Sequence, residues 1–446
     1  MGFQRNPERE SNLALVKNVY GAFWDRTIQG SSGQNLQKHQ LKLLRRQVAR
    51  AYQNSGFYRR KLKESGIRPS AIRSLEDMRK LPFVSRPELE TYFDDILAVP
   101  SSQVSTIRMT SGTTGHPLKV AYSRRDIELI ANASARKLTY HGVTKRDRMQ
   151  VTAAYGLAQG AWSAHWGAEK IGACIIPVGP GDTERQIRII KQLGTTVLYG
   201  ATNFHLRILE FAKSLGENLA DYKLRVGICV AEKPSKTQVS LLEDGFGYEK
   251  VAIDYGATEF PGFSVNCEND AAFHHVWADN YLVEVVDPKT HENLGEGERG
   301  ELVVSSLQRE AFPLIRYLSR DVTSISGFEK CGCGMSHPRV SADIDREDFM
   351  VKVRGVPVFP SHVEFVLSEL PVLTGNCQII VDKRTPSHDL VLKVETIRPL
   401  SSNEERMLKT QIADQVKNRI GIAINDLAFV PKGTFEGKFQ KTVTIS

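Results

Sequence analysis

The chain has 446 residues, a formal net charge of +8 at pH 7, 41% hydrophobic and 25% charged residues. A chain of this length exceeds what one hydrophobic core usually holds, so we expect two or more domains, and the composition excludes a disordered chain. The positive charge is spread along the sequence rather than gathered in one block, which argues against nucleic acid as a partner and suits a protein that handles small polyanions.

The first part of the chain is predicted to be helical over residues 12–65. Apolar residues recur there at three- and four-residue steps, as in Leu41, Leu44 and Val48, which is the pattern of a helix with one buried face. A short helix is expected to follow, with Ser74 as its N-cap.

Short apolar runs alternate with helical stretches from Thr106 to about Ala257. The runs are MQVTAAYG, ACIIPVG, TTVLYGAT, LRVGICVA and KVAIDYG. Apolar strands separated by helices predict a mostly parallel sheet that is buried on both faces. Ligands of such sheets gather at the carboxyl ends of the strands. Residues 276–305 alternate more regularly and predict a smaller antiparallel sheet.

The pattern changes after Asp345 to that of a compact α+β domain. It includes a long amphipathic helix, in which Leu408 and Ile412 begin a series of four-residue steps. The predicted fold class is therefore α/β. We expect a large N-terminal domain over 1–345, with mostly parallel sheets flanked by helices plus a smaller antiparallel or barrel-like part, and a small mobile α+β C-terminal domain over 346–446.

Cysteine usage and hydropathy indicate a cytoplasmic protein with no membrane partner. No apolar run approaches the roughly 18 residues of a membrane span, and the N-terminus lacks a signal-peptide core. Six cysteines at irregular spacings do not form a disulfide framework in a chain this long. Cys174, Cys229 and Cys377 lie in apolar runs and are expected to be buried. The oligomeric state stays open, with a homodimer as the commonest soluble form.

One segment is unusually rich in hydroxyls and glycines, TSGTTGHPLKV at Thr110–Val120. Such a loop can present N–H groups and hydroxyls to phosphate oxygens, because glycine lets the main chain approach closely. It is not a Walker A loop, since His116 and Pro117 follow the last glycine. A flexible linker explains the segment equally well when it is taken alone. The candidate phosphate-binding residues are Thr110, Ser111, Gly112, Thr113, Thr114 and Gly115.

Further motifs follow this loop in a fixed order. They are AAYGLAQGAWSAHWGAEKIGACIIPVGPGDTERQI, VAEKPS, DYGATEFPG, GELVVSSLQREAFPLIRYLSRDVT, DREDFMVKVRGVPVFPSHVE and TFEGKFQKTVTIS. The set resembles the adenylate-forming superfamily of acyl-CoA ligases and related synthetases, and within it the phenylacetate–CoA ligase branch. The resemblance extends from about Leu13 to Thr444. Each motif alone is weak, so the specificity comes from the set.

The resemblance implies an acid pocket and an adenine site in the large domain. Tyr155 would line the pocket for the carboxylic acid, and Gly156 would keep the backbone close to it. From the residues alone, Tyr155 is equally a core aromatic at a strand end. Ala231 and Glu232 would border the adenine of ATP or AMP.

The DYGATE segment would provide most of the remaining nucleotide contacts. By resemblance, Tyr255 stacks on adenine, Thr258 touches the α-phosphate, and Glu259 helps to hold magnesium, a hard ion that binds one or two carboxylates plus substrate phosphates. Asp321 would bind the ribose hydroxyls and Arg346 would contact the ribose. The other predicted nucleotide-binding residues of the segment are Asp254, Gly256 and Ala257.

The small domain would supply a catalytic lysine and a hinge. Lys438 follows Gly437 in the register of the lid loop that carries the adenylation lysine of this superfamily, and Lys441 is the alternative position. A lysine near the C-terminus is otherwise usually solvated surface. Asp348 would be the pivot of the small domain. Lys438, Glu259 and Thr258 are thus the predicted catalytic residues.

A group of cysteines and histidines predicts a second metal site. Cys267 lies eight residues before His275, and Cys331 and Cys333 follow about sixty residues later. Three thiolates and an imidazole would complete a tetrahedral structural zinc site. Some members of the phenylacetate–CoA ligase branch resemble the chain at these places, and the following Val-Trp favours His275 over His274. The alternative is a polar turn with free thiols, since C-x-C is a weaker signal than C-x-x-C.

The leading functional prediction is an ATP-dependent acid–thiol ligase. It would activate a carboxylic acid, aromatic or arylacetic, as an acyl adenylate, release pyrophosphate and transfer the acyl group to coenzyme A. One alternative passes the acyl group to a carrier protein or an amine, or the adenylyl group to a hydroxyl. The other is a catalytically silent nucleotide-binding relative. Departures from the superfamily pattern at His116, Leu318 and Asp345 leave the silent relative open as an alternative. The presence of Glu259, Asp321 and Lys438 argues against it.

Overall fold

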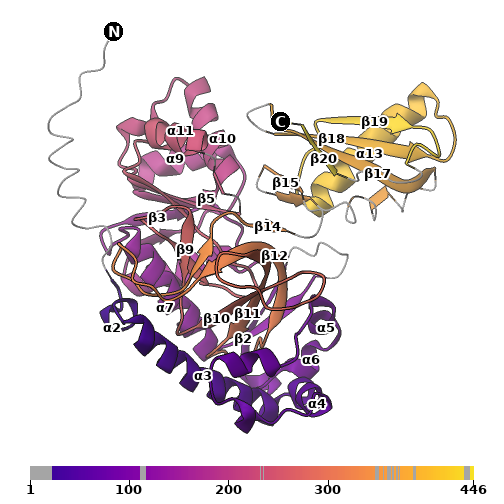
Figure 1. Cartoon of the computed structure of the whole chain (residues 1–446). Coiled ribbons are helices and arrows are strands. Elements are labelled where there is room, and N and C mark those ends of the chain that lie inside the picture. Colours follow the sequence, from indigo (N-terminus) through magenta and orange to yellow (C-terminus); the bar gives the residue numbers. More distant parts are fainter. Residues whose placement is uncertain are drawn as a thin grey trace. The chain divides into compact units, whose positions relative to one another are not determined.

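The computed structural model of the chain describes residues 23–446 with several short gaps (Figure 1). The gaps are 111–116, 232, 235, 347–350, 355, 359–362, 364–365, 368–369, 371, 385–387, 436–441 and 446. Apart from two short segments, a larger compact unit ends at Asp345 and a smaller one begins at Arg346. The sequence pattern changes at the same place.

Helices form the first part of the larger unit, shown in indigo in Figure 1. The prediction of helix over 12–65 is confirmed for its described part, where α3 spans Gly33–Asn54 and α4 spans Gly56–Glu64. Ser55 separates the two helices, and its side chain caps α4 by accepting from the N–H of Tyr58. The shorter elements are α2 (Arg26–Gln29), η1 (Pro69–Ala71), η2 (Glu76–Lys80), α5 (Arg86–Thr91), α6 (Phe93–Ile96) and η3 (Ser101–Gln103).

The helix predicted after Ser74 differs from the expectation. The structure has the 3-10 element η2 there, and Ser74 does not cap it. Instead, Asp77 Oδ2 accepts hydrogen bonds from the N–H groups of Arg73 and Ser74, at 2.7 and 2.8 Å. This local bond between a side chain and the backbone competes with an α-helical first turn.

The predicted parallel sheet is present, with strand order β4-β3-β5-β6-β7. Strand β3 pairs in parallel with β4 and with β5, and β6 pairs in parallel with β7. The strands are β3 (Arg148–Val151), β4 (Cys174–Ile176), β5 (Val197–Ala201), β6 (Val226–Val230) and β7 (Lys250–Ile253). Helix α7 (Arg124–Tyr140) precedes β3. The intervening helices are α8 (Gly160–Ile171), α9 (Thr183–Leu193), α10 (Thr202–Ser214), η4 (Leu219–Asp221) and α11 (Lys236–Phe246).

The predicted antiparallel sheet is larger than its sequence signal. Strands β10 (Tyr281–Val286) and β11 (Arg299–Ser306) occupy the predicted stretch and pair antiparallel. They belong to a seven-stranded sheet of order β10-β11-β12-β13-β9-β8, with β14 paired to β12. The other strands are β8 (Ser264–Asn266), β9 (Phe273–Val276), β12 (Tyr317–Ser326), β13 (Arg339–Ser341) and β14 (Asp345–Arg346). A separate antiparallel pair is formed by β1 (Val104–Met109) and β2 (Lys119–Ser123).

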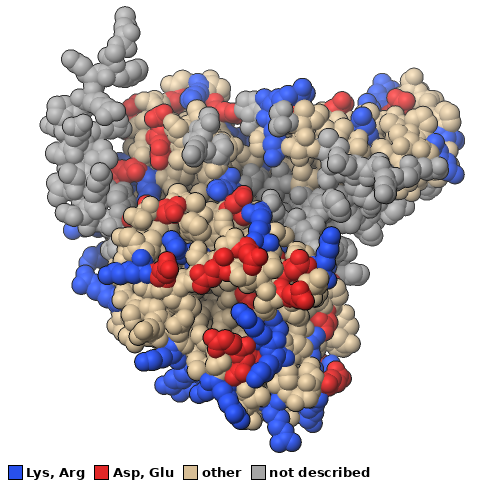
Figure 2. All heavy atoms as spheres, viewed as in Figure 1, with Lys and Arg blue, Asp and Glu red and all other residues tan. Residues whose placement is uncertain are grey.

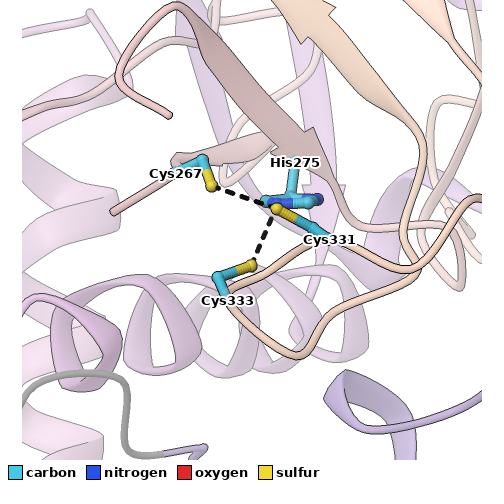
Figure 3. Close-up of side chains that lie close together, drawn as sticks. All are labelled: Cys267, His275, Cys331 and Cys333. Atoms are coloured by element: carbon cyan, nitrogen blue, oxygen red, sulfur yellow. Dashed lines mark hydrogen bonds between the residues drawn. The ribbon is translucent and has the colours of Figure 1, made fainter. Parts of the chain in front are cut away.

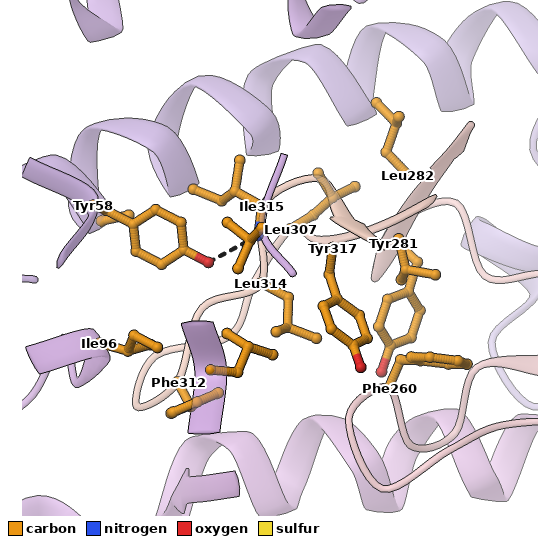
Figure 4. Packing of buried hydrophobic residues seen from close by; sticks show 14 of the residues in the cluster. Tyr58, Ile96, Phe260, Tyr281, Leu282, Leu307, Phe312, Leu314, Ile315 and Tyr317 are labelled. Atoms are coloured by element: carbon orange, nitrogen blue, oxygen red, sulfur yellow. Dashed lines mark hydrogen bonds between the residues drawn. The ribbon is translucent and has the colours of Figure 1, made fainter. Parts of the chain in front are cut away.

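A cluster of buried apolar side chains joins the N-terminal helices to the antiparallel sheet (Figure 4). Tyr58 of α4 lies in this cluster, and its hydroxyl donates to the carbonyl of Pro313 at 2.9 Å and accepts from the N–H of Ile315 at 3.1 Å. Burial raises the pKa of Tyr58 above its usual range, so the hydroxyl stays a donor. These bonds fasten the segment that leads into β12.

The smaller unit is the predicted α+β domain. Its sheet has the order β19-β18-β17-β20, with β17 and β18 antiparallel and the two outer pairs parallel. The predicted amphipathic helix is α13 (Ser402–Ile420), which begins at a capping box of Ser401 with Glu404 and buries Ile412 and Val416. The strands are β15 (Val351–Val353), β16 (Val356–Val358), β17 (Leu373–Asp382), β18 (Asp389–Thr396), β19 (Asp426–Val430) and β20 (Thr442–Ile445).

The cysteine predictions are confirmed in two cases and wrong in one. Cys229 and Cys377 are buried, whereas Cys174 is exposed. Cys174 is the first residue of β4, and β4 lies at the edge of the parallel sheet. A cysteine within an apolar run can therefore be exposed when its strand lies at the edge of the sheet.

The distribution of charge on the surface and the hydropathy of the helices agree with what the composition predicts. Lys and Arg are interspersed with Asp and Glu over the face shown in Figure 2, with no single basic block on it. Within the described ranges, no helix combines the length and the apolar character needed to cross a bilayer.

The close contact between α7 and α8 generates a prediction about stability. A Cβ at Gly167 of α8 would lie 2.5 Å from Cβ and 2.8 Å from the carbonyl carbon of Ser134 on α7. We expect Gly167→Ala to destabilise the larger unit by about 1–3 kcal/mol, because the helices must move apart. The control is Gly160→Ala in the same helix, where the nearest atom lies at 3.9 Å. Thermal unfolding measures both, and equal melting temperatures would contradict the prediction.

Candidate active site

Two of the predicted nucleotide-binding residues follow carboxyl ends of the parallel strands. Ala231 comes directly after β6, and Asp254 comes directly after β7. The backbone of Ala231 has a φ of 68°, a left-handed conformation that a residue with a side chain adopts only when its surroundings impose it. This edge of a parallel sheet is where ligands of such folds bind.

Asp254 is held in place by two side chains that the motif does not contain. Lys137 of α7 forms an ion pair with Asp254 Oδ2, and the Lys137 side chain is almost completely buried. The hydroxyl of Tyr199 donates to the same oxygen at 3.0 Å. Burial raises the pKa of Tyr199, which keeps the hydroxyl protonated. The DYGATE segment therefore begins at a fixed carboxylate.

A hydrogen bond joins the DYGATE segment to Asp321 on β12. The hydroxyl of Tyr255 donates to Asp321 Oδ2 at 2.8 Å. The Tyr255 ring makes edge contacts with Phe263 and His274, at centroid distances of 5.5 and 5.9 Å. Two residues 66 positions apart, predicted to bind the adenine and the ribose, thus lie side by side. The resemblance alone did not predict this hydrogen bond.

Arg86 joins the phosphate loop to the predicted magnesium ligand. Its Nη2 donates to Thr110 Oγ1 at 2.9 Å, and its Nη1 lies 3.3 Å from Glu259 Oε1. The hydroxyl of Tyr317 also donates to Glu259 Oε1, at 3.2 Å. Glu259 and Arg86 are both 6% exposed. The cost of burying the carboxylate is therefore offset by the charge of Arg86 and by the hydrogen bond from Tyr317. Nearby, the hydroxyl of Tyr122 donates to the carbonyl of Thr258.

Sequence reasoning missed Arg86, although a signal was available. Arg86 is the first residue of α5, after the capping box formed by Ser85 and Glu88. A cation in the first turn is unfavourable with the helix dipole. An arginine at that position therefore indicates partners from elsewhere in the fold. Glu259 and Thr110 are those partners, and Glu90 of the same helix also pairs with Arg86.

The predicted acid pocket contains an aromatic cluster at the start of α8. The hydroxyl of Tyr155 is 3.0 Å from His165 Nδ1. Trp162 Nε1 donates to the carbonyls of Tyr155 and Gly156, at 3.0 and 3.2 Å. A Cβ added at Gly156 would meet no atom within 4 Å, so space is open beside the backbone. Tyr155 is half-buried, which fits the wall of a pocket as well as a core position.

The four predicted zinc ligands lie together (Figure 3). Cys267 follows β8, His275 lies on β9, and Cys331 and Cys333 lie in the turn between β12 and β13. Their ligand atoms are all within 4.8 Å of one another. The Sγ atoms of Cys267 and Cys331 are 3.6 Å apart, and Cys333 Sγ is 3.3 Å from His275 Nε2. His274 does not contribute to this cluster.

The geometry of this cluster fits a tetrahedral metal site. With zinc–sulfur bonds of about 2.3 Å, two thiolates of a tetrahedron lie about 3.8 Å apart. His275 Nδ1 is 3.1 Å from the carbonyl of His337, so Nδ1–H is the donor and Nε2 is directed to the cysteines. A hydrogen bond with Cys333, together with burial, raises the pKa of Cys267 to about 11. A divalent cation would reverse this shift by stabilising the thiolate.

Several predicted site residues lie outside the described residues. They are Ser111, Gly112, Thr113, Thr114, Gly115, Glu232, Asp348 and Lys438, together with the alternative Lys441. Arg346 is placed only through the backbone pairing of β14 with β12. The roles assigned to these residues stay predictions.

Comparisons with known proteins agree with this architecture. The AMP-binding enzyme family matches residues 51–308, and its C-terminal domain family matches residues 355–446. The phenylacetate-coenzyme A ligase of Thermus thermophilus is 32% identical over 408 residues, which cover 87% of this chain and 91% of the relative. That of Escherichia coli is 33% identical over 421 residues, covering 92% and 95%. A crystal structure of 2-hydroxyisobutyryl-CoA ligase with 2-HIB-AMP and CoA has a TM-score of 0.86 at 26% identity, covering 95% of this chain and 92% of that one.

The two-unit α/β fold, with these motifs at the strand ends, is that of an adenylate-forming enzyme. The chain belongs to the AMP-binding enzyme family. The resemblance to the phenylacetate–CoA ligase branch is confirmed.

The Arg86–Glu259 pair generates the second prediction. Arg86→Met leaves Glu259 buried without its cation, and we expect a loss of about 3–5 kcal/mol in unfolding free energy. The control is Arg60→Met, whose pair with Asp95 is 48% and 39% exposed and contributes less than about 1 kcal/mol. Thermal unfolding measures both variants. Adding Glu259→Gln to Arg86→Met should recover part of the loss, and equal stability of the two single variants would contradict the prediction.

Proposed function

We propose that this protein is an AMP-forming acid–CoA ligase. A carboxylate oxygen attacks the α-phosphorus of ATP, the bond to the bridging oxygen breaks, and pyrophosphate leaves with the electron pair. The thiolate of coenzyme A then attacks the acyl carbonyl and AMP leaves. The first step is needed because oxide is a poor leaving group and AMP is a good one. The named activities of the full-length relatives support this proposal.

The observation that carries the proposal is the convergence of four segments of the larger unit. Tyr255 contacts Asp321, and Arg86 contacts both Thr110 and Glu259. These contacts connect residues that the sequence assigns to one nucleotide site, and the exchange assay below distinguishes an active enzyme from a catalytically silent relative. In our proposal Tyr255 stacks on adenine, Asp321 binds the ribose, and the loop from Thr110 onward cradles the phosphates.

The remaining steps use residues of the smaller unit. We assign adenylation to Lys438, whose ammonium would meet the charge that develops at the α-phosphate. A cation directed at the developing charge lowers the activation free energy by roughly 3–4 kcal/mol, by analogy with oxyanion donors. Asp348 would be the pivot and Arg346 a ribose contact. A rotation of the small domain about Asp348 would withdraw Lys438 after adenylation, which is the kind of hinge step that assembles one site and dismantles another.

Magnesium fits the carboxylate of Glu259. Arg86 and Tyr317 both contact Oε1, and Oε2, which has no partner among the residues the structure describes, would serve as the ligand of the cation. Magnesium in such sites binds one or two carboxylates plus substrate phosphates and neutralises the charge that develops on them. Arg86 would then hold the orientation of the carboxylate, while Thr110 keeps its own hydrogen bond to Arg86.

Zinc fits the cluster of Cys267, His275, Cys331 and Cys333. All four groups are protein ligands, which leaves no open position, so the metal would be a structural staple rather than a catalyst. It would fasten the turn between β12 and β13 to β8 and β9. The cytoplasmic location and the homodimer stay predictions of the sequence.

The function is tested by exchange of pyrophosphate into ATP across a panel of aromatic, arylacetic and aliphatic acids. We expect acid-dependent exchange, followed by consumption of coenzyme A. Exchange with no acid of the panel would overturn the proposal in favour of a silent relative. Exchange without consumption of coenzyme A would indicate another acceptor, such as a carrier protein or an amine.

Lys438→Ala tests the assignment of the lysine in the same assay. The variant should lose exchange, by on the order of a hundredfold or more, and still form thioester from a supplied acyl adenylate. Lys441→Ala is the matched control and should retain exchange. A Lys438→Ala protein with full exchange activity would sink the assignment.

The zinc site is tested by metal analysis and thermal unfolding. We expect about one zinc per chain in the purified protein and a lower melting temperature after chelation, because the metal joins three segments. Cys331→Ser should lose the metal and the stability together. The control is Cys174→Ser, because Cys174 is an exposed cysteine outside the cluster. Protein without stoichiometric metal, with Cys331→Ser as stable as the control, would disprove the site.

A further inference from the structure

Arg108 lies beside the aromatic cluster of the proposed acid pocket. It belongs to β1, two residues before Thr110. Its guanidinium lies over the ring of Trp162 at 4.5 Å and over that of Trp166 at 5.7 Å. Its Nη1 donates to the carbonyl of Gly156 at 3.3 Å. These contacts place a cation next to Tyr155 and Gly156, the two residues assigned to the acid.

Arg108 is half-buried, and its charge has no carboxylate partner within the described part of the chain. By contrast, the buried Arg136 and Arg316 pair with Asp279 and Glu284. Among the described residues, the buried Nε atom of Arg108 finds no hydrogen-bond partner. Burial lowers the pKa of Arg108. The aromatic faces compensate part of this desolvation but supply no counter-charge. The geometry therefore presents an incompletely satisfied cation.

The other ionisable groups of the cluster do not provide the missing charge. His165 Nε2 lies 3.4 Å from Glu169 Oε1, and its Nδ1 is taken by Tyr155. Glu169 is thus directed to His165. At the phosphate loop, Arg86 already occupies the cation position between Thr110 and Glu259. Arg108 makes its polar and ring contacts with the segment from Gly156 to Trp166 instead.

An acid whose only charged group is the carboxylate that reacts would place apolar atoms against this guanidinium and displace its remaining water. Removing the last water from an unpaired charge is unfavourable, whereas an anionic partner forms a strong charge-assisted hydrogen bond. A pocket that contains such a cation discriminates against ligands that leave it unpaired. The acid that suits the pocket therefore carries an anionic group of its own.

We propose that Arg108 is a specificity-determining residue, and that the substrate is an acid with a second carboxylate besides the one that is activated. This inference rests on the proposed function and names the substrate class of the same site. The second carboxylate is unchanged by the reaction, so the product is a thioester that retains one free carboxylate. Arg108 would pair with that group while the first carboxylate meets ATP.

The test compares phenylacetate with its 2-, 3- and 4-carboxy derivatives in the exchange assay. The wild-type protein should prefer at least one dicarboxylate by tenfold or more in kcat/KM. Arg108→Met, which keeps a long apolar side chain against the tryptophans, should remove that preference. We expect a higher KM for the dicarboxylate and a higher kcat/KM for phenylacetate, because no unpaired cation then opposes the apolar acid, while the KM for ATP stays the same.

Two further variants keep the test decisive. Arg108→Lys retains the charge and should retain most of the preference, even if the Met variant folds poorly. Arg146→Met, at an exposed arginine, is the matched control and should behave as wild type. A wild-type protein that favours phenylacetate, or an equal loss on both acids in Arg108→Met, would overturn the inference while leaving the ligase function intact. Absence of exchange with every acid would instead overturn the function itself.

Discussion

The buried ion pair between Arg86 and Glu259 is the contact on which the candidate site depends. Glu259 comes from the loop after the parallel sheet, and Arg86 comes from the first turn of α5 in the helical region. A carboxylate that is 6% exposed is tolerated only when charge and hydrogen bonds compensate it. Arg86 does this and also holds Thr110. The pair thereby fixes a separation between two segments that are far apart in the chain, before any nucleotide is bound.

Much of the fold could be predicted because it depends on periodicity. The five apolar runs became β3 to β7, and the four-residue steps after Asp345 became α13. The failures had local causes that periodicity does not contain. Asp77 turns the chain where Ser74 was expected to cap a helix. Cys174 is exposed because strand order, which the sequence does not show, puts β4 at an edge.

The residues of the candidate site also fall into two groups, those that the sequence predicted and those that only the structure identified. Tyr255, Asp321 and the four metal-binding candidates were found because each belongs to a recognisable motif, and the structure brings them together. Arg86, Lys137 and Arg108 were missed because each is a single basic residue in an ordinary helix or strand. Their importance lies in what they contact across the fold. An isolated arginine or lysine in a sequence is most often solvated. Only the tertiary structure distinguishes Lys137 and Arg108 from the rest, whereas Arg86 has one sequence signal, its place in the first turn of a helix.

Strand β9 has two histidines whose side chains point to opposite faces, since successive residues of a strand alternate. His275 faces the cysteines, and His274 contacts the ring of Tyr255 at 5.9 Å. A slip of one residue in the pairing of β9 with β13, where Arg339 now lies opposite His275, would exchange the two rings. In the proposed zinc site the metal would help to hold this register, and without the cysteines the register would depend on the strand pairing alone. Within β9, an insertion of two residues would keep the two rings on their present faces, whereas a single insertion would exchange them.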